Sequence, residues 1–370
     1  MRICAVAGLR ERGFMKKICL ILENGEKFPG FAIGAEKETI GEVVFTTGMS
    51  GYVETLTDPS FFGQIVVQTF PLIGDYGVMK EDFESDRPHL SGYVVRDLCD
   101  TPSNFRSQGK LDDMLKEYGV PGICGVDTRK LTRIVREYGV MNGAIVEGEP
   151  TAELMERIKA YRQIDAVANV SCKEPYHVKQ GKPRFKVTMI DYGAKRNIAR
   201  ELAARGCDVT VVPHDTSAEK ILEGKPDGIM LSNGPGDPAE NKFEIEQLVK
   251  LQKSGIPMFG ICLGHQLLAL ANGMKSFKLK YGHRGENQPV KDVETGRVYI
   301  TSQNHGYALD SDTVPKGAKV SFYNVNDGTC EGVEYEGGNF TVQFHPEACG
   351  GPLDTRFMFD KFIAAMEGKR

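Results

Sequence analysis

The spacing of apolar and polar positions changes about halfway along the 370-residue chain. In the second half, apolar runs of strand length alternate with helix-like segments of about 8–15 residues, which is typical of βαβ units and a parallel sheet. The strand KVTMID, the helix KRNIARELAARG and the strand DVTVVP set this pattern over residues 186–213. Beyond residue 275 the pattern favours further strands and a closing amphipathic helix, TRFMFDKFIAAMEG. We therefore expect an α/β domain with a mostly parallel sheet.

The first half is rich in strand-like segments that are separated by turn signals. Asn24-Gly25 lies between two apolar segments and predicts a two-residue hairpin. Helical periodicity covers residues 111–118 and 127–138, and the second stretch stops at Gly139. The expected division is a mixed α and β domain over residues 15–171, a linker over 172–185 and the α/β domain over 186–370.

The first residues, MRICAVAGLRERGFMKK, contain only a short apolar run before Arg10 and Glu11. A secretory signal needs a longer apolar region and a small-residue cleavage pattern, and neither follows here. Met15-Lys-Lys resembles a second start. We therefore interpret residues 1–14 as an extension without a role in the fold.

Composition narrows the function classes. The chain has 46 Lys and Arg against 50 Asp and Glu, a formal net charge of −4, which argues against nucleic acid or an anionic membrane as the main partner. No apolar run approaches the ~20 residues that cross a bilayer. The nine cysteines show no C-x-x-C spacing, so the sequence predicts a cytoplasmic protein with reduced thiols and no metal site.

A cysteine lies where the strand IPMFGIC meets the helix-like run that follows it. A lone cysteine is usually a small buried hydrophobe. Gly260-Ile-Cys262-Leu-Gly264, however, matches the G-x-nucleophile-x-G pattern of a sharp strand-to-helix turn. The helix N-terminus favours a thiolate there and is expected to lower the pKa of the cysteine. The backbone N–H of Leu263 is placed to donate to an oxyanion.

A thiol nucleophile needs a base, which is usually a histidine oriented by a third group. Three of the seven histidines are candidates: His265, His305 and His345. His345 follows a predicted strand, and Glu347 lies two residues beyond it. His265 lies three residues after Cys262 on the same helix face. The spacing of these residues leaves all three histidines open.

The loop LSNGPGDP follows another predicted strand at residue 231. Two glycines around a proline leave backbone N–H groups that could complete an oxyanion hole, although a plain strand-to-helix turn would have the same composition. The chain contains no G-x-x-x-x-G-K-[ST] motif, so no ATP site is expected in it.

The stretches SNGPGDP, FGICLGHQLLALANG, TSQNHGYALD and VQFHPEA, in that order, resemble the class I, triad-type glutamine amidotransferases. The first half sharpens the resemblance. GEVVFTTGMSGYVETLTDPSFFGQIVVQTFPLIGDYG, GVDTRKLTRIVREYG and IDYGAKRNIARELAARG resemble the small, glutamine-hydrolysing subunit of carbamoyl-phosphate synthase. This resemblance covers the chain from about residue 16 to its end, and other amidotransferases of the class lack such a first domain.

The resemblance implies roles for individual residues. Cys262 would attack the side-chain amide of L-glutamine, His345 would carry the proton, and Glu347 would orient His345. It is the resemblance that selects His345 over His265. The backbone N–H groups of Leu263 and Gly236 would hold the oxyanion. The other implied glutamine-binding residues are Ser60, Gly234, Gln266, Asn304, Gly306 and Tyr307.

The resemblance also implies a partner. A large carbamoyl-phosphate synthase subunit would bind ATP, Mg²⁺ and bicarbonate and would receive ammonia from this chain, which needs no cofactor of its own. The product would serve arginine and pyrimidine synthesis. Two alternatives are the glutaminase component of another amidotransferase complex, against which residues 16–170 argue, and a non-catalytic scaffold, against which the intact Cys262, His345 and Glu347 argue.

Removal of residues 1–14 tests the interpretation of the first residues as an extension. We expect the shortened chain to keep the melting temperature of the full chain, because these residues have no role in the predicted fold. Thermal unfolding of the two proteins side by side measures this. A clear drop in melting temperature after the deletion would contradict the interpretation.

Overall fold

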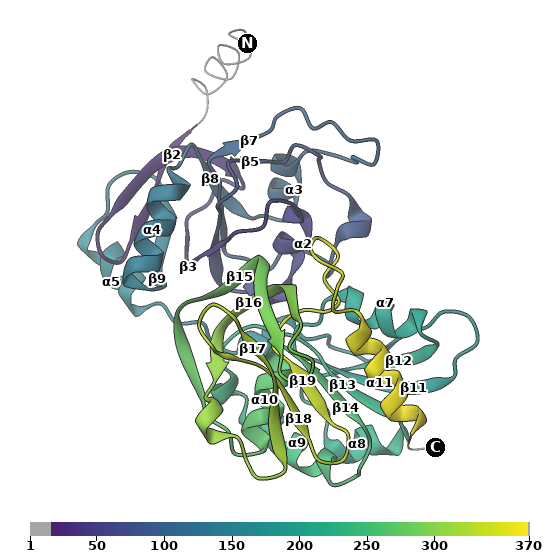
Figure 1. Cartoon of the computed structure of the whole chain (residues 1–370). Helices are drawn as coiled ribbons and strands as arrows, with labels where there is room; N and C mark the ends of the chain where they lie inside the picture. The colour runs from purple at the N-terminus through teal and green to yellow at the C-terminus, as the bar shows by residue number, and fades with distance from the viewer. Residues whose placement is uncertain (1–15, 369–370) are drawn as a thin grey trace. The chain divides into compact units, whose positions relative to one another are not determined.

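The computed structural model describes residues 16–368, so the predicted extension over residues 1–14 lies outside the described part of the chain. The chain forms two compact units (Figure 1). The first unit holds the described residues up to Gln163, apart from two short segments, 57–62 and 83–86. These two segments belong to the second unit, together with the chain from Ile164 onwards. The first half of the sequence therefore supplies residues to the second unit.

The first unit is built around a closed barrel with the strand order β1-β2-β8-β6-β4-β3-β9. The predicted hairpin is confirmed, because β1 and β2 pair antiparallel on either side of Gly25, whose φ is 87°. The barrel strands are β1 (Lys17–Leu22), β2 (Lys27–Gly34), β3 (Thr39–Thr46), β4 (Gln64–Gln68), β6 (Gly92–Val94), β8 (Pro121–Cys124) and β9 (Met141–Val146).

Helices and a small second sheet complete the first unit. Both helices predicted in the first half are confirmed as α3 (Leu111–Glu117) and α4 (Thr128–Tyr138). Asp127 starts α4 by accepting a hydrogen bond from the Lys130 N–H, which is a common helix N-cap. The remaining elements are α2 (Tyr52–Thr57), α5 (Ala152–Ala160), β5 (Leu72–Ile73) and β7 (Asp97–Leu98), the last two being paired with each other.

A ten-stranded sheet forms the centre of the second unit, in the order β10-β12-β11-β13-β14-β19-β18-β16-β15-β17, where the edge strand β10 covers Tyr176–Val178. Its parallel part, predicted from the βαβ pattern, consists of β12 (Cys207–Pro213), β11 (Phe185–Asp191), β13 (Gly228–Leu231), β14 (Met258–Ile261) and β19 (Phe340–Val342). An antiparallel part continues it, with β15 (Ser276–Asp292), β16 (Val298–Leu309), β17 (Ala318–Asn324) and β18 (Cys330–Tyr335).

Helices cover both faces of the parallel part, because apolar side chains of its strands point alternately to one face and the other. On β11, Met189 packs with α7 (Arg196–Ala204) and α11 (Phe357–Glu367) in one apolar cluster. Its neighbour Ile190 lies in a second cluster, which includes residues of α8 (Ala218–Glu223), α9 (Lys242–Gln252) and α10 (Leu263–Ala271). Successive residues thus face opposite layers, which explains why these strands read as continuous apolar runs.

Two structural findings refine the sequence-based division. The predicted linker over residues 172–185 is wrong as a plain connection, because it contains β10 (Tyr176–Val178), which pairs antiparallel with β12. The short helix α6 (Ala166–Val170) belongs to the second unit rather than the first. Short polar stretches such as YHVK show too little periodicity to reveal an edge strand, whose pairing depends on a distant partner.

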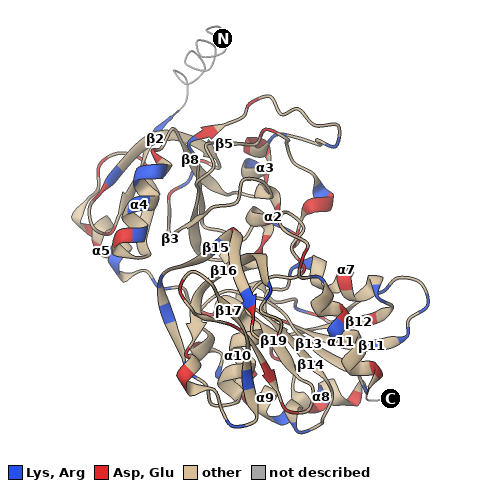
Figure 2. Cartoon of the chain, viewed as in Figure 1, with Lys and Arg blue, Asp and Glu red and all other residues tan. Residues whose placement is uncertain are grey.

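The charged residues and the apolar segments of the folded chain are distributed as its near-neutral composition predicts. Figure 2 shows basic and acidic residues interspersed along both units in the drawn view. Within residues 16–368, no helix has the length and apolar character needed to span a membrane.

The turn between β14 and α10 is tight on both sides of Cys262. This residue has φ 52° and ψ −104°, a backbone conformation that is rare for residues with a side chain. A Cβ on Gly260 would lie 2.8 Å from the Gly264 carbonyl oxygen, and a Cβ on Gly264 would lie 2.5 Å from the Leu231 carbonyl oxygen. The glycines of the motif are therefore required by backbone packing, which leaves the cysteine in the strained central position.

We expect Gly264→Ala to destabilise the second unit by about 1–3 kcal/mol, the usual cost of overpacking. Alanine favours a helix by about 1 kcal/mol over glycine, but the contact with the Leu231 backbone outweighs this gain. Urea unfolding of the variant and its parent measures the difference. Gly109→Ala is the matched control, because a Cβ there meets nothing within 4 Å. Equal stability of Gly264→Ala and its parent would refute the packing argument.

Candidate active site

Three neighbouring parallel strands deliver the predicted catalytic segments to one edge of the sheet (Figure 1). Cys262 follows β14 directly, and its N–H donates to the Val342 carbonyl at the end of β19, 2.9 Å away. The loop LSNGPGDP leaves β13 on the other side of β14. Because the carboxyl ends of parallel strands meet at the same edge, the predicted nucleophile, its base and the glycine loop are brought together there.

His345 and Glu347 form a hydrogen-bonded pair in the protein interior. The distance from His345 Nδ1 to Glu347 Oε1 is 2.7 Å, and both side chains are buried. The pair fixes the tautomer, because Nδ1 donates its proton to the carboxylate and Nε2 keeps a lone pair. His345 Nε2 is buried without a hydrogen-bond partner among the described residues. The imidazole therefore has the arrangement of a general base that a carboxylate orients.

The two competing histidines lack such a carboxylate. His265 Nδ1 lies 2.7 Å from Thr341 Oγ1, and complete burial lowers the pKa of His265 to about 3. The ring nitrogens of His305 lie 2.7 Å from the Tyr307 carbonyl oxygen and 3.0 Å from Gln303 Oε1. The contacts thus distinguish His345 from the other two histidines as the candidate base, which their positions in the sequence could not do.

The expected lowering of the Cys262 pKa is wrong for the resting thiol. Burial raises the pKa of Cys262 to about 12, and the ammonium of Lys195 only partly opposes this rise. The side chain is 2% exposed, so loss of hydration outweighs the helix end that the sequence argument relied on. Its Sγ lies 3.6 Å from the Asn304 carbonyl oxygen, within range of a weak S–H donor bond. Cys262, the predicted nucleophile, therefore rests as a neutral thiol.

A buried lysine lies beside the histidine–glutamate pair. Lys195 Nζ is 3.3 Å from Glu347 Oε1 and 3.6 Å from Asp58 Oδ2, and all three side chains are buried. Burial alone would lower the pKa of Lys195, but Asp58, Glu347 and Glu84 together raise it. Burial also works against the ionised form of Glu347, yet His345 and Lys195 hold the pKa of Glu347 at about 2. Glu347 is therefore a carboxylate throughout the neutral range.

Glu84 belongs to the same buried group. Its backbone carbonyl accepts from the Arg196 N–H at 2.7 Å, and its Oε2 accepts from the Asn197 N–H at 3.1 Å. These are N–H groups of the first turn of α7, which lack partners within the helix. Asn197 in turn donates from Nδ2 to the Glu347 carbonyl oxygen. Glu84 thus caps α7 and connects the helix start to the segment that carries Glu347.

Asn233, in the loop after β13, joins several parts of the site. Its Nδ2 donates to Ser60 Oγ at 2.9 Å and to the Gly193 carbonyl at 3.0 Å. Asp58 holds the same segment by accepting from the Ser60 N–H at 2.9 Å and from Asn304 Nδ2 at 3.1 Å. Segment 57–62, which contains the predicted glutamine-binding residue Ser60, is therefore fixed beside a second such residue, Asn304.

The remaining predicted residues lie around the same edge. Gln266 Nε2 donates to the Tyr307 carbonyl and to Gln343 Oε1, each at 2.9 Å. Gly234 leaves no room for a side chain, because a Cβ there would lie 2.2 Å from the Tyr192 carbonyl oxygen. Gly236 has φ 92°, Leu263 is the first residue of α10, and Gly306 follows Asn304 on β16.

Sequence reasoning missed Lys195, Asp58, Asn233 and Glu84. Lys195 follows β11 in the stretch DYGAKRN, and this position after a predicted parallel strand could have indicated a place at the site. Asp58 adjoins Ser60, and Asn233 lies inside the glycine loop that the sequence did single out. Glu84 carried no signal, because its role depends on a helix more than a hundred residues away.

Comparison with known proteins matches both halves of the chain. Residues 188–365 match the family model for class-I glutamine amidotransferases, and residues 20–145 match that for the carbamoyl-phosphate synthase small chain, CPSase domain. A carbamoyl phosphate synthase small chain from Listeria monocytogenes serotype 4b is 51% identical over 96% of this chain and 98% of that protein. A carbamoyl phosphate synthase small chain from Archaeoglobus fulgidus is 53% identical over 94% of this chain and 98% of that protein. The resemblance stated from sequence motifs is confirmed.

Among solved structures, a putative GMP synthase component from Thermoplasma acidophilum has a TM-score of 0.45 and is 23% identical, over 52% of this chain and 97% of that chain.

Glu84 gives the stability of the second unit a specific pH dependence. Burial raises the pKa of Glu84 from 4.5 to about 7, although Lys195 opposes the rise and Glu347 adds to it. Because the folded pKa is raised, the contribution of Glu84 to stability is present below pH 4.5 and is lost as the pH rises through 7. We expect Glu84→Gln to remove this loss, which is at most about 3 kcal/mol.

Melting temperatures of the parent and Glu84→Gln at pH 5 and pH 8 test this expectation. The decrease between the two pH values should be smaller in the variant, which keeps an acceptor oxygen for the Asn197 N–H. Glu240→Gln alters an exposed glutamate and serves as the control, with the parent's pH dependence. Parallel pH curves for the parent and Glu84→Gln would contradict the assignment.

Proposed function

Since the chain belongs to the carbamoyl phosphate synthase small chains and is a glutamine-hydrolysing subunit of that enzyme, we propose that Cys262, His345 and Glu347 perform the hydrolysis. The 2.7 Å pair of His345 and Glu347, at the sheet edge where β14 delivers Cys262, is the observation that supports this most directly. The substrate is the side-chain amide of L-glutamine, and the products are glutamate and ammonia.

The first half of the reaction needs a proton transfer, because Cys262 rests as a neutral thiol. His345 Nε2 accepts the thiol proton while Sγ bonds to the amide carbon of glutamine. The imidazolium that forms is stabilised by Glu347, which is already ionised. His345 then gives the proton to the departing nitrogen, the C–N bond breaks, and ammonia leaves a glutamyl thioester on Cys262.

In the second half of the reaction, His345 first acts on water instead of on the thiol. His345 removes a proton from water, and the resulting hydroxide adds to the thioester carbon. The carbon–sulfur bond then breaks, and the proton returns to the cysteine sulfur. During both additions the carbonyl oxygen carries negative charge, which the backbone N–H groups of Leu263 and Gly236 would stabilise. Leu263 starts helix α10, so its N–H has no acceptor within the helix.

The glutamine amino-acid end requires polar contacts close to Cys262. Ser60 is fixed by Asn233, and Asn304 is fixed by Asp58, so both side chains are held before substrate arrives. Such preorganisation lowers the cost of ordering these groups on binding. With them, we assign to glutamine binding the residues Gly234, Gln266, Gly306 and Tyr307.

A small chain of carbamoyl phosphate synthase implies a large-subunit partner. We propose that ammonia passes to that subunit without release, because in water it would become ammonium and lose its nucleophilic lone pair. ATP, Mg²⁺ and bicarbonate would bind to the large subunit, and this chain would use no cofactor in glutamine hydrolysis. Carbamoyl phosphate made by the complex would supply arginine and pyrimidine synthesis in the cytoplasm.

Cys262→Ser, assembled with the large subunit, tests the division of labour. We expect glutamine-dependent carbamoyl phosphate synthesis to fall at least about a thousand-fold, because loss of a covalent nucleophile removes most of the catalysis. Ammonia-dependent synthesis should stay near the parent rate, since it needs only the large subunit's sites. Both rates are measured on the same purified complex.

Cys349→Ser is the matched control, because this cysteine lies two residues beyond Glu347 and has no role in the proposed chemistry. It should leave both rates close to those of the parent. A Cys262→Ser complex that loses glutamine- and ammonia-dependent synthesis equally would refute the proposal. Unchanged glutamine-dependent synthesis would instead favour a scaffold role for this chain.

A further inference from the structure

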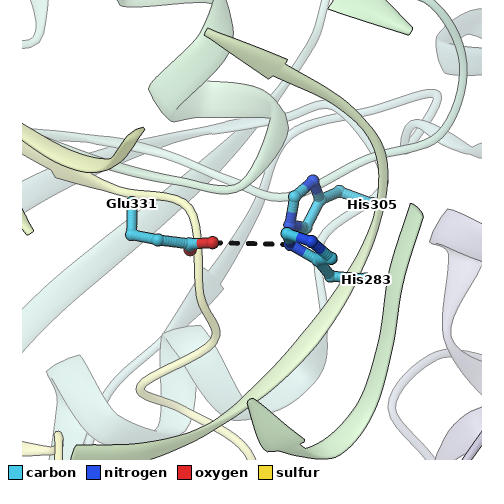
Figure 3. A group of neighbouring side chains, drawn as sticks. All are labelled: His283, His305 and Glu331. Carbon is cyan, nitrogen blue, oxygen red and sulfur yellow. Dashed lines mark ion pairs between the residues drawn. The ribbon is translucent and has the colours of Figure 1, made fainter. Parts of the chain in front are cut away.

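We propose that the antiparallel part of the second sheet holds a closed structural zinc site, formed by His283 of β15, His305 of β16 and Glu331 of β18 (Figure 3). One possible ligand atom from each of the three lies within 4.8 Å of those of the other two. All three residues are buried. No step of the proposed glutamine chemistry uses the cluster, although His305 follows Asn304 in the chain and is close enough to His345 for the two rings to interact electrostatically.

Two distances in the cluster match those between ligand atoms on one zinc ion. Zinc binds nitrogen and oxygen at about 2.0–2.1 Å with tetrahedral angles, which separates neighbouring ligand atoms by about 3.3 Å. His283 Nδ1 lies 3.5 Å from Glu331 Oε1, the pair joined by the dashed line in Figure 3. His305 Nε2 lies 3.0 Å from Gln303 Oε1. Gln303 therefore offers the fourth ligand, an amide oxygen.

Each proposed ligand is oriented by a second residue. His283 Nε2 donates to Asp327 Oδ2 at 2.8 Å, and His305 Nδ1 donates to the Tyr307 carbonyl at 2.7 Å. Glu331 Oε2 accepts from Gln303 Nε2 at 3.0 Å. Metal-bound histidines nearly always donate from their other ring nitrogen to a carboxylate or a carbonyl. Both histidines already make this outer contact, which leaves Nδ1 of His283 and Nε2 of His305 for an ion.

Hydrogen-bond roles within the cluster also call for a cation. A carbonyl oxygen only accepts, so the contact with Tyr307 places the proton of a neutral His305 on Nδ1. His305 Nε2 then presents a lone pair to Gln303 Oε1, another acceptor. Gln303 keeps this orientation because its Nε2 donates to Glu331 and to Thr301 Oγ1. His283 Nδ1 is buried without a hydrogen-bond partner among the described residues. Although burial lowers the pKa of His283, Asp327 and Glu331 raise it to about 9, so a zinc ion would replace the proton on His283 Nδ1. The ion would also satisfy the two facing acceptors, His305 Nε2 and Gln303 Oε1.

The chemical types of the four proposed ligands indicate which ion would bind and whether its role would be structural. Two imidazoles with two oxygens suit zinc, whereas magnesium and calcium prefer oxygen ligands alone. The carboxylates of Glu331 and Asp327 balance the double positive charge. Four protein ligands in a buried position leave no open place for a substrate, which is typical of structural zinc. The ion would join β15, β16 and β18, and β16 carries Asn304 to Tyr307.

The sequence predicts no metal site, because no two of its cysteines have the C-x-x-C spacing of a zinc site. The proposed ligands lie on three strands that pair only in the folded protein: β15 pairs with β16, and β16 pairs with β18. Regular ligand spacing is a property of sites within one loop or helix. It gives no signal for a site built across a sheet.

Zinc titration of the full chain tests the proposal, in a Cys262→Ser background that removes the reactive thiol as a competing ligand. After treatment with a chelator, this protein should bind one equivalent of zinc more tightly than does the His283→Gln variant, by at least about 100-fold. Asp327→Asn weakens the contact that orients His283 and keeps an acceptor oxygen for Thr329, so it should weaken zinc binding about 10–100-fold. Cobalt(II) in place of zinc should give the intense visible absorption of a tetrahedral ion.

His177→Asn is the matched control, because it removes an exposed histidine and should leave zinc affinity unchanged. Zinc should also raise the melting temperature of the Cys262→Ser protein more than that of Asp327→Asn. Equal zinc binding by all variants would assign the ion to other thiols or histidines and overturn the proposal. Failure of the Cys262→Ser protein itself to bind zinc would also overturn the proposal. Should His283→Gln fail to fold, Glu331→Gln and Asp327→Asn provide the same comparison.

Discussion

The ion pairs of the Lys195 ammonium are the interaction on which the proposed active site depends. Lys195 lies in the interior with the carboxyl groups of Asp58, Glu84 and Glu347, and its Nζ is within 3.6 Å of carboxylate oxygens of Asp58 and Glu347. Without a positive charge, three carboxyl groups so close together would take up protons or move apart. With it, Glu347 stays ionised next to His345, and Asp58 stays in place beneath Ser60 and Asn304. One side chain therefore supports both the proposed base and the proposed glutamine-binding residues.

The same charge group explains how distant parts of the chain form one site. Segments 57–62 and 83–86 belong to the second unit although the sequence around them builds the first. Asp58 and Ser60 enter with the first segment, and Glu84 enters with the second, where it caps helix α7. Buried charges need partners, so each of these contacts would be costly to break from one side alone. The ionic group thereby fixes both segments against the sheet.

The proposed chemistry fits the electrostatics of the nucleophile. Burial keeps Cys262 protonated, so the thiol is protected from oxidation and alkylation until a base removes its proton. The strained turn that holds it is maintained by the packing of Gly260 and Gly264 against backbone atoms. On β16, Asn304 donates to Asp58, while its neighbour His305 contacts Gln303. A metal ion bound to His305 would stiffen the strand that carries Asn304 and Tyr307, both proposed to bind glutamine.

The sequence by itself determined the elements whose signals are local. The βαβ pattern predicted the parallel strands, Asn24-Gly25 predicted the hairpin, and the two glycines around Cys262 predicted the sharp turn, because each depends on neighbouring residues. Motifs in sequence order then indicated the family and named Cys262, His345 and Glu347. The resting state of the thiol, the choice among three histidines by contact, and the edge strand β10 were decided by the tertiary structure. So were the roles of Lys195, Glu84 and the cluster around Glu331. Burial, charge pairing and pairing between strands arise from residues that are far apart in the chain, and no local pattern records them.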